Sequence, residues 1–356
     1  MGKTYTGSEI LLESLRREGV EVFFGLPGGV VLPLYDALYS SGVRHLLVRH
    51  EQAAAFAADG YARVTGKVGV CLGTSGPGAT NLTTGLTSAM MDSIPVVALT
   101  GQVPLQLIGK DAFQECDTIG IMMPSTKASF LVRSAGDLPR IMHQAFKTAI
   151  SGRPGPVLVD LPKNVLMESA EPQYPSTPGV EQLERKREWK DEDIEHAAEM
   201  ILESRRAVLY VGGGLIAANA WLELRELAEM AHIPVTTTLM GLGAFPSAHP
   251  LSLGMLGMHG SYATNQSICN CDLLIAVGAR FDDRVTGRLK DFCTQAKKIH
   301  FDVDPSEINK NVQVDLSLVG DARESLRALI AALKRLVGER GTAAPPVRQQ
   351  WLQRIE

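Results

Sequence analysis

Short, uniformly apolar runs alternate along this chain with longer segments whose apolar residues recur at helical spacing. The runs have the composition of buried strands, and the longer segments have the pattern of amphipathic helices. In the first half we expect helices over 8–18, 31–40, 51–63, a segment ending at 91, and 138–150, with strands over 20–25, 46–48, 68–72, 96–100 and 157–162. Such alternation predicts a parallel sheet covered by helices on both faces.

The second half repeats this alternation after a break in the pattern. Here we expect helices over 191–204, 217–231 and 322–337, and strands over 207–211, 234–238, 273–277 and 298–303. A chain of 356 residues is long for one domain, and its length favours about two. We therefore predict an α/β fold of two doubly wound parallel-sheet domains, at 1–167 and 191–340. The proline-containing segments 168–190 and 341–356 are interpreted as linkers.

Composition narrows the class of partner. The chain is 45% hydrophobic with a formal charge of −4 and no long basic block, which argues against nucleic acid and anionic membranes. The longest uncharged stretches, 68–91, 93–109 and 233–271, are broken by Gly, Pro, Ser, Thr and Asn, so we expect buried strands there and no membrane span. The five cysteines lack metal-site spacing, and residues 1–7 lack signal or transit character. These features predict a reduced, cytoplasmic protein without a metal site of its own.

One carboxylate stands where a strand is expected to turn into a helix. Leu46, Leu47 and Val48 form an apolar run, and Glu51 begins an alanine-rich segment of high helix propensity. A carboxylate buried between apolar neighbours is costly without a partner and has a raised pKa. The alternative is a first-turn or capping glutamate that stabilises the helix by its charge. These residues alone support the two interpretations about equally.

Other polar and glycine-rich turns also follow expected strands. In the first half these turns are 27–29, 74–81 and 101–102, and in the second half they are 212–214 and 278–284. In a parallel sheet, turns that follow strands lie at one edge, where ligands bind. Glycines at such an edge suit phosphate groups, because backbone amides can approach the ligand closely and helix N-termini favour anions.

The segment 278–284 carries two arginines and two aspartates after an apolar strand. Arg280 and Arg284 offer bidentate donors for phosphate or carboxylate, and Asp282 and Asp283 offer acceptors for ribose or amide groups. The alternative is a surface cluster of ion pairs that satisfies itself.

Eight segments of the chain form a longer series when they are taken in order. They are Leu-Pro-Gly-Gly at 26–29, Arg-His-Glu-Gln-Ala-Ala at 49–54, Thr-Ser-Gly-Pro-Gly-Ala-Thr-Asn at 74–81, Met-Asp-Ser-Ile-Pro at 91–95, Asp-Ala-Phe-Gln-Glu at 111–115, Ser-Gly-Arg-Pro-Gly-Pro at 151–156, Gly-Met-Leu-Gly-Met-His-Gly at 254–260, and 278–284. In this order and spacing they resemble the large catalytic subunit of acetohydroxyacid synthase, also called acetolactate synthase. The similarity runs from about residue 7 to residue 322.

The resemblance implies a transferase that depends on thiamine diphosphate and joins two 2-oxo acids with loss of carbon dioxide. Members of this family have three α/β domains, which bind the aminopyrimidine of the cofactor, FAD, and the diphosphate through Mg²⁺. The resemblance makes 1–167 the pyrimidine-binding domain and 191–340 a Rossmann-like central FAD-binding domain. It implies pyruvate and either a second pyruvate or 2-oxobutyrate as substrates, in the first common step of isoleucine, valine and leucine biosynthesis.

Roles in the family carry over to the matching positions. The Glu51 carboxyl group is expected to hydrogen-bond a pyrimidine nitrogen and favour the imino tautomer that removes the thiazolium C2 proton. Gly29 is expected to face the reacting oxygen with its amide, and Phe113 and Lys163 to line the substrate pocket. Further thiamine diphosphate contacts are expected at Pro27, Gly28, Thr74, Pro77, Asn81 and Gln114. Contacts to a structural FAD are expected at Arg153, Gly212, Gly213, Gly214, Thr238, Leu239, Met258, His259, Gly278, Arg280, Asp282, Arg284, Val285, Asp302, Asp321 and Ala322.

The chain departs from the family pattern in two places. Leu26 stands where an aromatic residue is common, which puts one edge contact to the cofactor in doubt. No Gly-Asp-Gly followed by Asn-Asn is found, and residues 320–322 lead into a basic helix instead. We therefore expect the diphosphate-binding domain and its Mg²⁺ ligands to be missing, 341–356 to be a linker toward them, and the chain alone to be inactive.

Partners and alternatives follow from the same resemblance. The family places its cofactor between subunits, so a homodimer or tetramer is implied, together with a small regulatory subunit. A related pyruvate oxidase or glyoxylate carboligase is an alternative, although Glu51 argues against the carboligase, which has an apolar residue at that position. The remaining alternative is a non-catalytic FAD-binding or assembly module.

Overall fold

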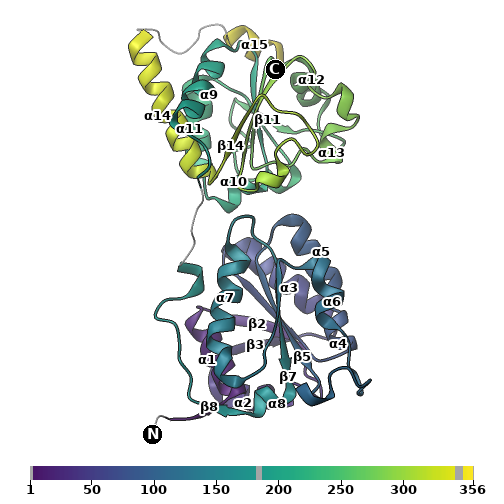
Figure 1. Cartoon of the computed structure of the whole chain (residues 1–356). Helices are drawn as coiled ribbons and strands as arrows, with labels where there is room; N and C mark the ends of the chain where they lie inside the picture. Colours follow the sequence, from purple (N-terminus) through teal and green to yellow (C-terminus); the bar gives the residue numbers. More distant parts are fainter. Residues whose placement is uncertain (1–2, 182–186, 341–347, 356) are drawn as a thin grey trace. The chain divides into compact units, whose positions relative to one another are not determined.

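Both main sheets are parallel throughout, as the alternation of strands and helices predicted. The computed structural model describes residues 3–181, 187–340 and 348–355. By their mutual contacts the residues form two units, Met1–Glu184 and Arg185–Glu356, each built around one six-stranded sheet (Figure 1). The predicted fold class, two α/β parallel-sheet domains, is confirmed.

The sheet of the first unit is buried at its centre and open at one edge. Its strands are, in spatial order, β3 (Arg44–Leu47), β2 (Val22–Gly25), β4 (Gly69–Gly73), β5 (Val96–Gln102), β7 (Val157–Pro162) and β6 (Ala128–Leu131). All residues of β4, β5 and β7 are buried, because helices cover both of their faces. The edge strand β3 leaves Leu46 and Leu47 exposed.

Helices cover this sheet in two layers (Figure 1). One layer holds α1 (Gly7–Arg17), α2 (Leu32–Ser41) and α7 (Leu138–Ile150), and the other holds α3 (Glu51–Thr65), α4 (Pro77–Thr80), α5 (Thr83–Asp92) and α6 (Thr118–Met122). Helix α3 packs closely on the sheet through alanines, and a Cβ added to Gly69 of β4 would lie 2.1 Å from the Ala58 carbonyl oxygen. A helix that returns from a parallel strand begins at the carboxyl edge of the sheet, so α3 starts there with Glu51.

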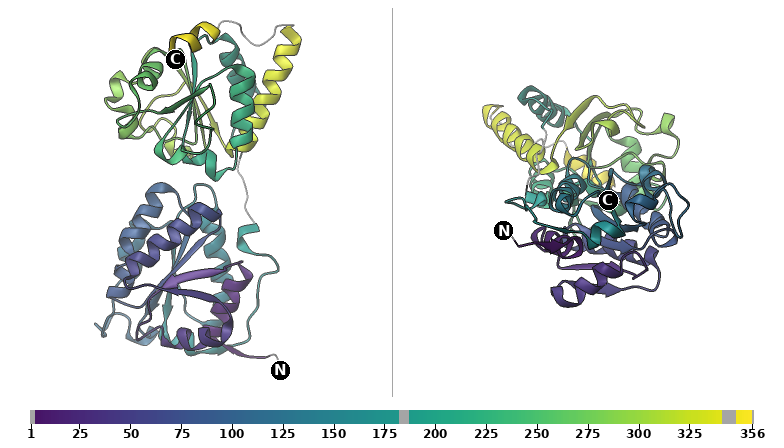
Figure 2. Two further views of the ribbon diagram at one scale, coloured as in Figure 1. Left: turned by 180° about the vertical axis from the view of Figure 1, so that it is seen from behind. Right: turned by 60° about the horizontal axis from the view of Figure 1, so that its bottom comes forward.

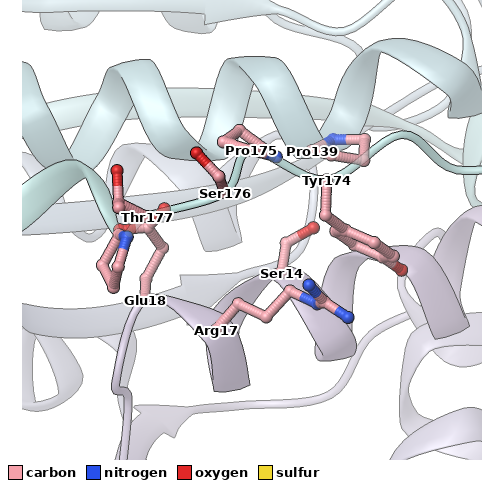
Figure 3. Close-up of a pocket in the computed structure, with 9 residues that line it drawn as sticks. Ser14, Arg17, Glu18, Pro139, Tyr174, Pro175, Ser176 and Thr177 are labelled. Atoms are coloured by element: carbon pink, nitrogen blue, oxygen red, sulfur yellow. The ribbon is translucent and has the colours of Figure 1, made fainter.

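The segment after β7 returns along the first unit. Helix α8 (Lys163–Met167) follows β7, and β8 (Ser169–Ala170) pairs in antiparallel fashion with β1 (Tyr5–Thr6). Residues beyond it, within the predicted linker, lie against α1 and α7 around a cavity of about 100 Å³ (Figure 3). The Arg17 guanidinium stacks 4.1 Å from the Tyr174 ring, and Gly179 N donates to Glu18 Oε2 at 2.7 Å. Residues 182–186 of the predicted linker lie outside the described residues.

The second unit has the same layered plan (Figure 2). Its strands are, in spatial order, β11 (Ser252–Met255), β10 (Val235–Thr237), β9 (Ala207–Val211), β12 (Leu273–Val277), β13 (Lys297–Asp302) and β14 (Leu316–Val319). One face is covered by α9 (Asp191–Glu203), α11 (Trp221–Ala231) and α14 (Ala322–Arg340), and the other by α12 (Tyr262–Asn270) and α15 (Arg348–Ile355). The helix predicted over 217–231 is α11, which begins only at Trp221. Ala217 instead ends a separate short helix, α10 (Gly213–Ala217), and Asn219 between the two adopts a left-handed φ of 52°.

Helix α15 is fastened to the second unit by a buried cation. The predicted linker 341–356 therefore divides: 341–347 lie outside the described residues, and 348–355 form this helix. Arg348 is fully buried and donates to the carbonyl oxygens of Ile201 and Ala231, and to Ser204 Oγ at 2.9 Å. These acceptors lie at the C-terminal ends of α9 and α11, where helix dipoles favour positive charge. Burial lowers the pKa of Arg348 to about 10.

We predict that Arg348→Ala destabilises the second unit by roughly 2–4 kcal/mol, because several buried carbonyl groups lose a charged donor. All three tryptophans, Trp189, Trp221 and Trp351, belong to this unit. Their fluorescence during urea unfolding therefore reports the second unit selectively. Arg354→Ala, on the exposed side of the same helix, is the matched control. Equal unfolding midpoints for the two variants would contradict the capping role of Arg348.

Candidate functional site

Glu51 is the first residue of α3, directly after strand β3, and its side chain is only 6% exposed. The helix is capped by the preceding residue, because His50 Nδ1 accepts a hydrogen bond from Gln52 N at 3.1 Å. Glu51 Oε2 instead accepts from Asn81 Nδ2 at 3.0 Å. His50 is thus the N-cap, and Glu51 is the acidic residue of the first turn, where its charge also stabilises the helix as the alternative interpretation expected.

The ends of β2 and β4 close in on this carboxylate. A Cβ added to Gly78 would lie 3.2 Å from Glu51 Oε1 and 2.6 Å from Thr74 Cγ2. A Cβ added to Gly28 would lie 2.5 Å from the Thr74 side chain. Glycine at these two positions therefore lets the turns after β2 and β4 pack closely against Thr74 and Glu51, where a side chain would collide with them. Gly28, Thr74 and Asn81, which we expected at one edge with Glu51, lie together in the structure.

Two hydroxyl groups in this turn are buried without a partner. Thr74 Oγ1 and Ser75 Oγ form no hydrogen bond with any of the described residues. Buried polar atoms of this kind are uncommon and call for a specific explanation, such as a bound ligand. A ligand with polar atoms beside this turn would satisfy them.

Tyr35 on α2 contributes to the same environment, although no pattern in the sequence singled it out. Its hydroxyl lies 3.1 Å from His45 Nε2. Burial, and then the charge of Glu51, raise the pKa of Tyr35 well above its usual range, so the phenol stays protonated.

The loop after β5 is pinned to the glycine turn. A Cβ added to Gly76, whose φ is +58°, would lie 2.7 Å from the Gln114 carbonyl oxygen. Gln114 itself has a φ of 59°, which only tight local packing tolerates in a residue with a side chain. Its neighbour Phe113 is 86% exposed, so the predicted substrate-facing ring stands outside the core.

A buried polar network supports this loop from inside the sheet. The Asp160 carboxylate accepts from Thr100 Oγ1 at 2.7 Å and from Gln102 Nε2 at 3.0 Å. Gln102 Nε2 also donates to the Cys116 carbonyl oxygen at 3.1 Å, and Gln102 Oε1 accepts from Val103 N at 2.8 Å. We expected residues 101–102 in the turn after the strand, but β5 continues through Gln102. The Gln102 side chain is buried within the sheet.

Among the other positions predicted in the first unit, Lys163 begins α8 after β7, and Pro27 and Gly29 lie in the turn after β2. Pro77 is the first residue of α4. No hydrogen bond or ion pair in the described ranges joins Lys163 or Phe113 to Glu51. Arg153 donates to Ser93 Oγ at 2.8 Å and to the Met91 carbonyl at 3.3 Å.

In the second unit, every strand of the sheet delivers predicted residues at its carboxyl end. Residues that follow the ends of parallel strands gather at one edge, where open α/β sheets bind ligands. In chain order they are Gly212, Gly213 and Gly214 after β9, Thr238 and Leu239 after β10, Met258 and His259 after β11, Gly278, Arg280, Asp282, Arg284 and Val285 after β12, Asp302 at the end of β13, and Asp321 and Ala322 after β14.

The glycines of this edge are packed against each other. A Cβ on Gly212 would lie 2.1 Å from the Gly278 carbonyl oxygen, and a Cβ on Gly278 would lie 2.6 Å from Gly214 Cα. Leu239 and Met258 are 70% and 62% exposed, which leaves apolar surface beside the glycines. Glycine at these positions therefore lets the turns after β9 and β12 pack closely together.

The charged groups of 278–284 do not neutralise one another. Asp282 caps the short helix α13 (Asp283–Thr286) by accepting from Arg284 N at 2.9 Å. Arg284 and Asp283 are 4.0 Å apart on the surface, a separation of little energetic value. Arg280 forms no ion pair with any residue that the structure describes. The alternative of a self-satisfied surface cluster is therefore not what the structure contains.

No helix among the residues that the structure describes is long and apolar enough to cross a membrane. Nor do they contain a group of three or more His, Cys, Asp or Glu side chains placed to hold a metal ion.

Comparison with known families agrees with this division of the chain. Residues 5–121 match the N-terminal TPP binding domain of thiamine pyrophosphate enzymes, and residues 194–329 match the central domain of the same enzymes. The chain belongs to the family of thiamine pyrophosphate enzymes.

Within that family it is similar to acetolactate synthase large subunits. It is 50% identical over 352 residues to the probable acetolactate synthase large subunit of Methanocaldococcus jannaschii, a match that covers 98% of this chain and 58% of that protein. It is 52% identical over 329 residues to the acetolactate synthase isozyme 2 large subunit of Escherichia coli, covering 92% and 59%. The chain thus spans a little over half the length of these relatives.

We predict that Asp160 makes the stability of the first unit depend on pH. Burial raises the pKa of Asp160 to about 6, above the value of about 3.9 expected in an unfolded chain. Its stabilising contribution is therefore complete below about pH 4 and is lost as the pH rises through about 6. Asp160→Asn removes this titration, so wild type should lose roughly 2–3 kcal/mol relative to the variant between about pH 4 and pH 7.

Urea unfolding followed by circular dichroism measures this difference, and transitions without a tryptophan signal belong to the first unit. Asp36→Asn, at an exposed position on α2, is the matched control and should show the pH dependence of wild type. Parallel pH profiles for wild type and Asp160→Asn would refute the prediction.

Proposed function

We propose that this chain provides the pyrimidine-binding and FAD-binding domains of an acetolactate synthase large subunit. The reaction is the condensation of pyruvate with a second pyruvate or with 2-oxobutyrate, with loss of carbon dioxide. The observation that carries the proposal is the buried Glu51 carboxylate, which accepts a hydrogen bond from Asn81 beside the unpartnered hydroxyl groups of Thr74 and Ser75.

Thiamine diphosphate fits the residues at this edge. Its aminopyrimidine has ring nitrogens and an amino group, which match the Glu51 carboxylate and the unpartnered hydroxyl groups of Thr74 and Ser75. When bound, this cofactor supplies a carbon acid that adds to a 2-oxo group and accepts the electrons of decarboxylation.

The residues of this chain then have a limited task. Glu51 holds or transfers a proton at a ring nitrogen, and its burial excludes water that would compete for that proton. Asn81 orients the carboxyl group by its hydrogen bond to Oε2. The glycine turn admits the ring, while Gln102 and Asp160 position the loop that carries Phe113 and Gln114.

FAD fits the edge of the second unit by the same kind of test. The closely packed glycine turns at 212–214 and 278 bring backbone to this edge, Arg280 and Arg284 suit a diphosphate, and Asp302 and Asp321 suit ribose or ribityl hydroxyl groups. We propose a structural flavin here and assign it no hydride transfer. Arg153 and Ala322 are proposed as further contacts.

Several parts of the proposal concern groups outside the described residues. Mg²⁺ and the diphosphate would be held by a further domain of the enzyme. A homodimer or tetramer and a small regulatory subunit are proposed as partners, and the cytoplasm as the location. Phe113, which is 86% exposed, and Lys163 would complete the substrate pocket.

We predict that Glu51→Gln lowers acetolactate formation by about 10²–10⁴-fold, because an amide cannot exchange the proton. The assay uses a chimaera in which this chain replaces the matching part of the Escherichia coli isozyme 2 large subunit. Glu13→Gln, on the outer surface of α1, is the matched control and should keep full activity. FAD binding should survive in both variants, and unchanged turnover in Glu51→Gln would refute the assignment.

The products of the same chimaera separate acetolactate synthase from its relatives. Acetyl phosphate would indicate an oxidase, and tartronate semialdehyde from glyoxylate would indicate a carboligase. Acetolactate from pyruvate is the expected product.

We predict that the 356-residue chain alone binds FAD but forms no acetolactate from pyruvate, thiamine diphosphate and Mg²⁺. The flavin absorbance that remains with the protein after gel filtration measures the first property, and a colorimetric acetoin assay measures the second. Turnover by the chain alone would show that these two domains hold a complete active site.

A further inference from the structure

The loop that leaves β12 is held by hydrogen bonds to its backbone carbonyl groups. Five consecutive carbonyl oxygens, from Gly278 to Asp282, accept hydrogen bonds, two of them from Asn311 and the others from different parts of the second unit. The donors are Gly214 N for Gly278 at 3.1 Å, His300 Nε2 for Ala279 at 2.8 Å, Asn311 Nδ2 for Arg280 at 3.4 Å and for Phe281 at 3.2 Å, and Val285 N for Asp282 at 3.0 Å.

Strand pairing does not extend along this loop, because β12 ends at Val277. The last strand-like bond is made by Gly278 N, which donates to the Phe301 carbonyl at 2.8 Å. Beyond it the backbone has a positive φ at Gly278, +58°, which glycine adopts readily, and at Phe281, +51°, which is strained. An aromatic residue adopts such a φ only when its surroundings enforce it. Among the described residues, side chains supply the donors for the carbonyl groups of Ala279, Arg280 and Phe281.

His300 is the central restraint. It is fully buried in β13, and its Nε2 lies 2.8 Å from the Ala279 carbonyl oxygen. A carbonyl oxygen only accepts, so Nε2 must carry the hydrogen in this contact. The Asp302 carboxylate lies 3.6 Å from the same nitrogen, and its negative charge favours a hydrogen on Nε2. The ring also packs at 76° and 5.0 Å against Phe281.

The position of His300 follows from strand register. Tyr210, Ala276 and His300 are aligned across β9, β12 and β13, so their side chains project from the same face of the sheet. Ala276 between them is small, and the Phe281 ring packs against both neighbours, 5.6 Å from Tyr210 and 5.0 Å from His300. The strained residue Phe281 thus packs against side chains that project from one face of three neighbouring strands.

We propose that His300, assisted by Asn311, is a positioning residue for flavin binding. Its hydrogen bond fixes the Ala279 carbonyl inward, which turns the adjoining Arg280 and Asp282 toward the open edge of the sheet. The inference rests on the FAD function proposed above. It assigns a role in ligand binding to a buried histidine that cannot itself touch the ligand.

The test measures FAD affinity of the 356-residue chain by flavin fluorescence titration. His300→Leu should weaken binding by about tenfold, because the loop loses the donor that fixes it. His300→Gln places an amide donor near the same carbonyl and should stay within about threefold of wild type. Asn311→Ala changes an exposed side chain, so it keeps the test open should His300→Leu fail to fold, and it should also weaken binding.

The matched control is His249→Leu. His249 also belongs to the second unit and makes two hydrogen bonds, to Glu229 Oε1 at 3.2 Å and from Leu251 N at 3.1 Å, but none to the loop. It should bind FAD as wild type does. Amide hydrogen exchange without flavin should be faster at residues 279–282 in His300→Leu and unchanged in His249→Leu.

The outcomes separate the inference from the function on which it rests. A wild-type chain that binds no FAD would overturn both. Wild-type binding with unchanged affinity in His300→Leu and Asn311→Ala would overturn the inference alone. Equal loss in His300→Gln and His300→Leu, or in His249→Leu, would overturn it as well, because packing rather than the hydrogen bond would then govern affinity.

Discussion

The parallel direction of its strands governs where this chain can place chemistry. Strands covered by helices on both faces must be apolar along their length, so polar groups collect where the strands end. Parallel strands all end at the same edge, and in both units the residues proposed to bind cofactors follow the strands at that edge. The positions of Glu51 and Asn81 in the first unit, and of Arg280 and Asp302 in the second, are consequences of the same constraint.

Two buried acidic residues of the first unit, Glu51 and Asp160, differ in the hydrogen bonds that they accept. Glu51 accepts a hydrogen bond from a single amide, that of Asn81, which suits the ligand-binding role that we propose for it. Asp160 is enclosed by two donors within the sheet and its oxygens are already engaged. Neither has a basic partner among the described residues. Proton exchange is thus proposed for Glu51, whereas Asp160 holds a loop in place through Gln102.

Much of this architecture could be predicted from one sequence because the central strands are uniformly apolar. The expected strands 157–162, 207–211 and 273–277 agree with β7, β9 and β12 at both ends. The edge strands β6, β11 and β14 escaped prediction, because partial exposure lets polar residues interrupt their pattern. Helix α15 was not predicted because it is short, its only apolar residues are Trp351, Leu352 and Ile355, and its docking depends on a buried arginine.

The candidate site, too, could be predicted only in part from the sequence. The ends of expected strands were enough to group Glu51 with Gly28, Thr74 and Asn81. The network around Asp160 could not be inferred, because it depends on the register that places Thr100 opposite Asp160. His300 likewise acquires its role through alignment with Ala276 on a neighbouring strand. Cross-strand register is set by the whole sheet and leaves no local signature in the chain.

The edge strand β3 has a consequence for handling the protein. Its outer backbone groups have no partner strand among the described residues, and Leu46 and Leu47 present apolar surface beside them. An open apolar edge is a template on which other chains can add as strands. Arg44 is the single charged residue within β3, so its positive charge is what opposes the addition of other chains along this strand. The solubility of the first unit therefore depends on salt concentration, which screens that charge.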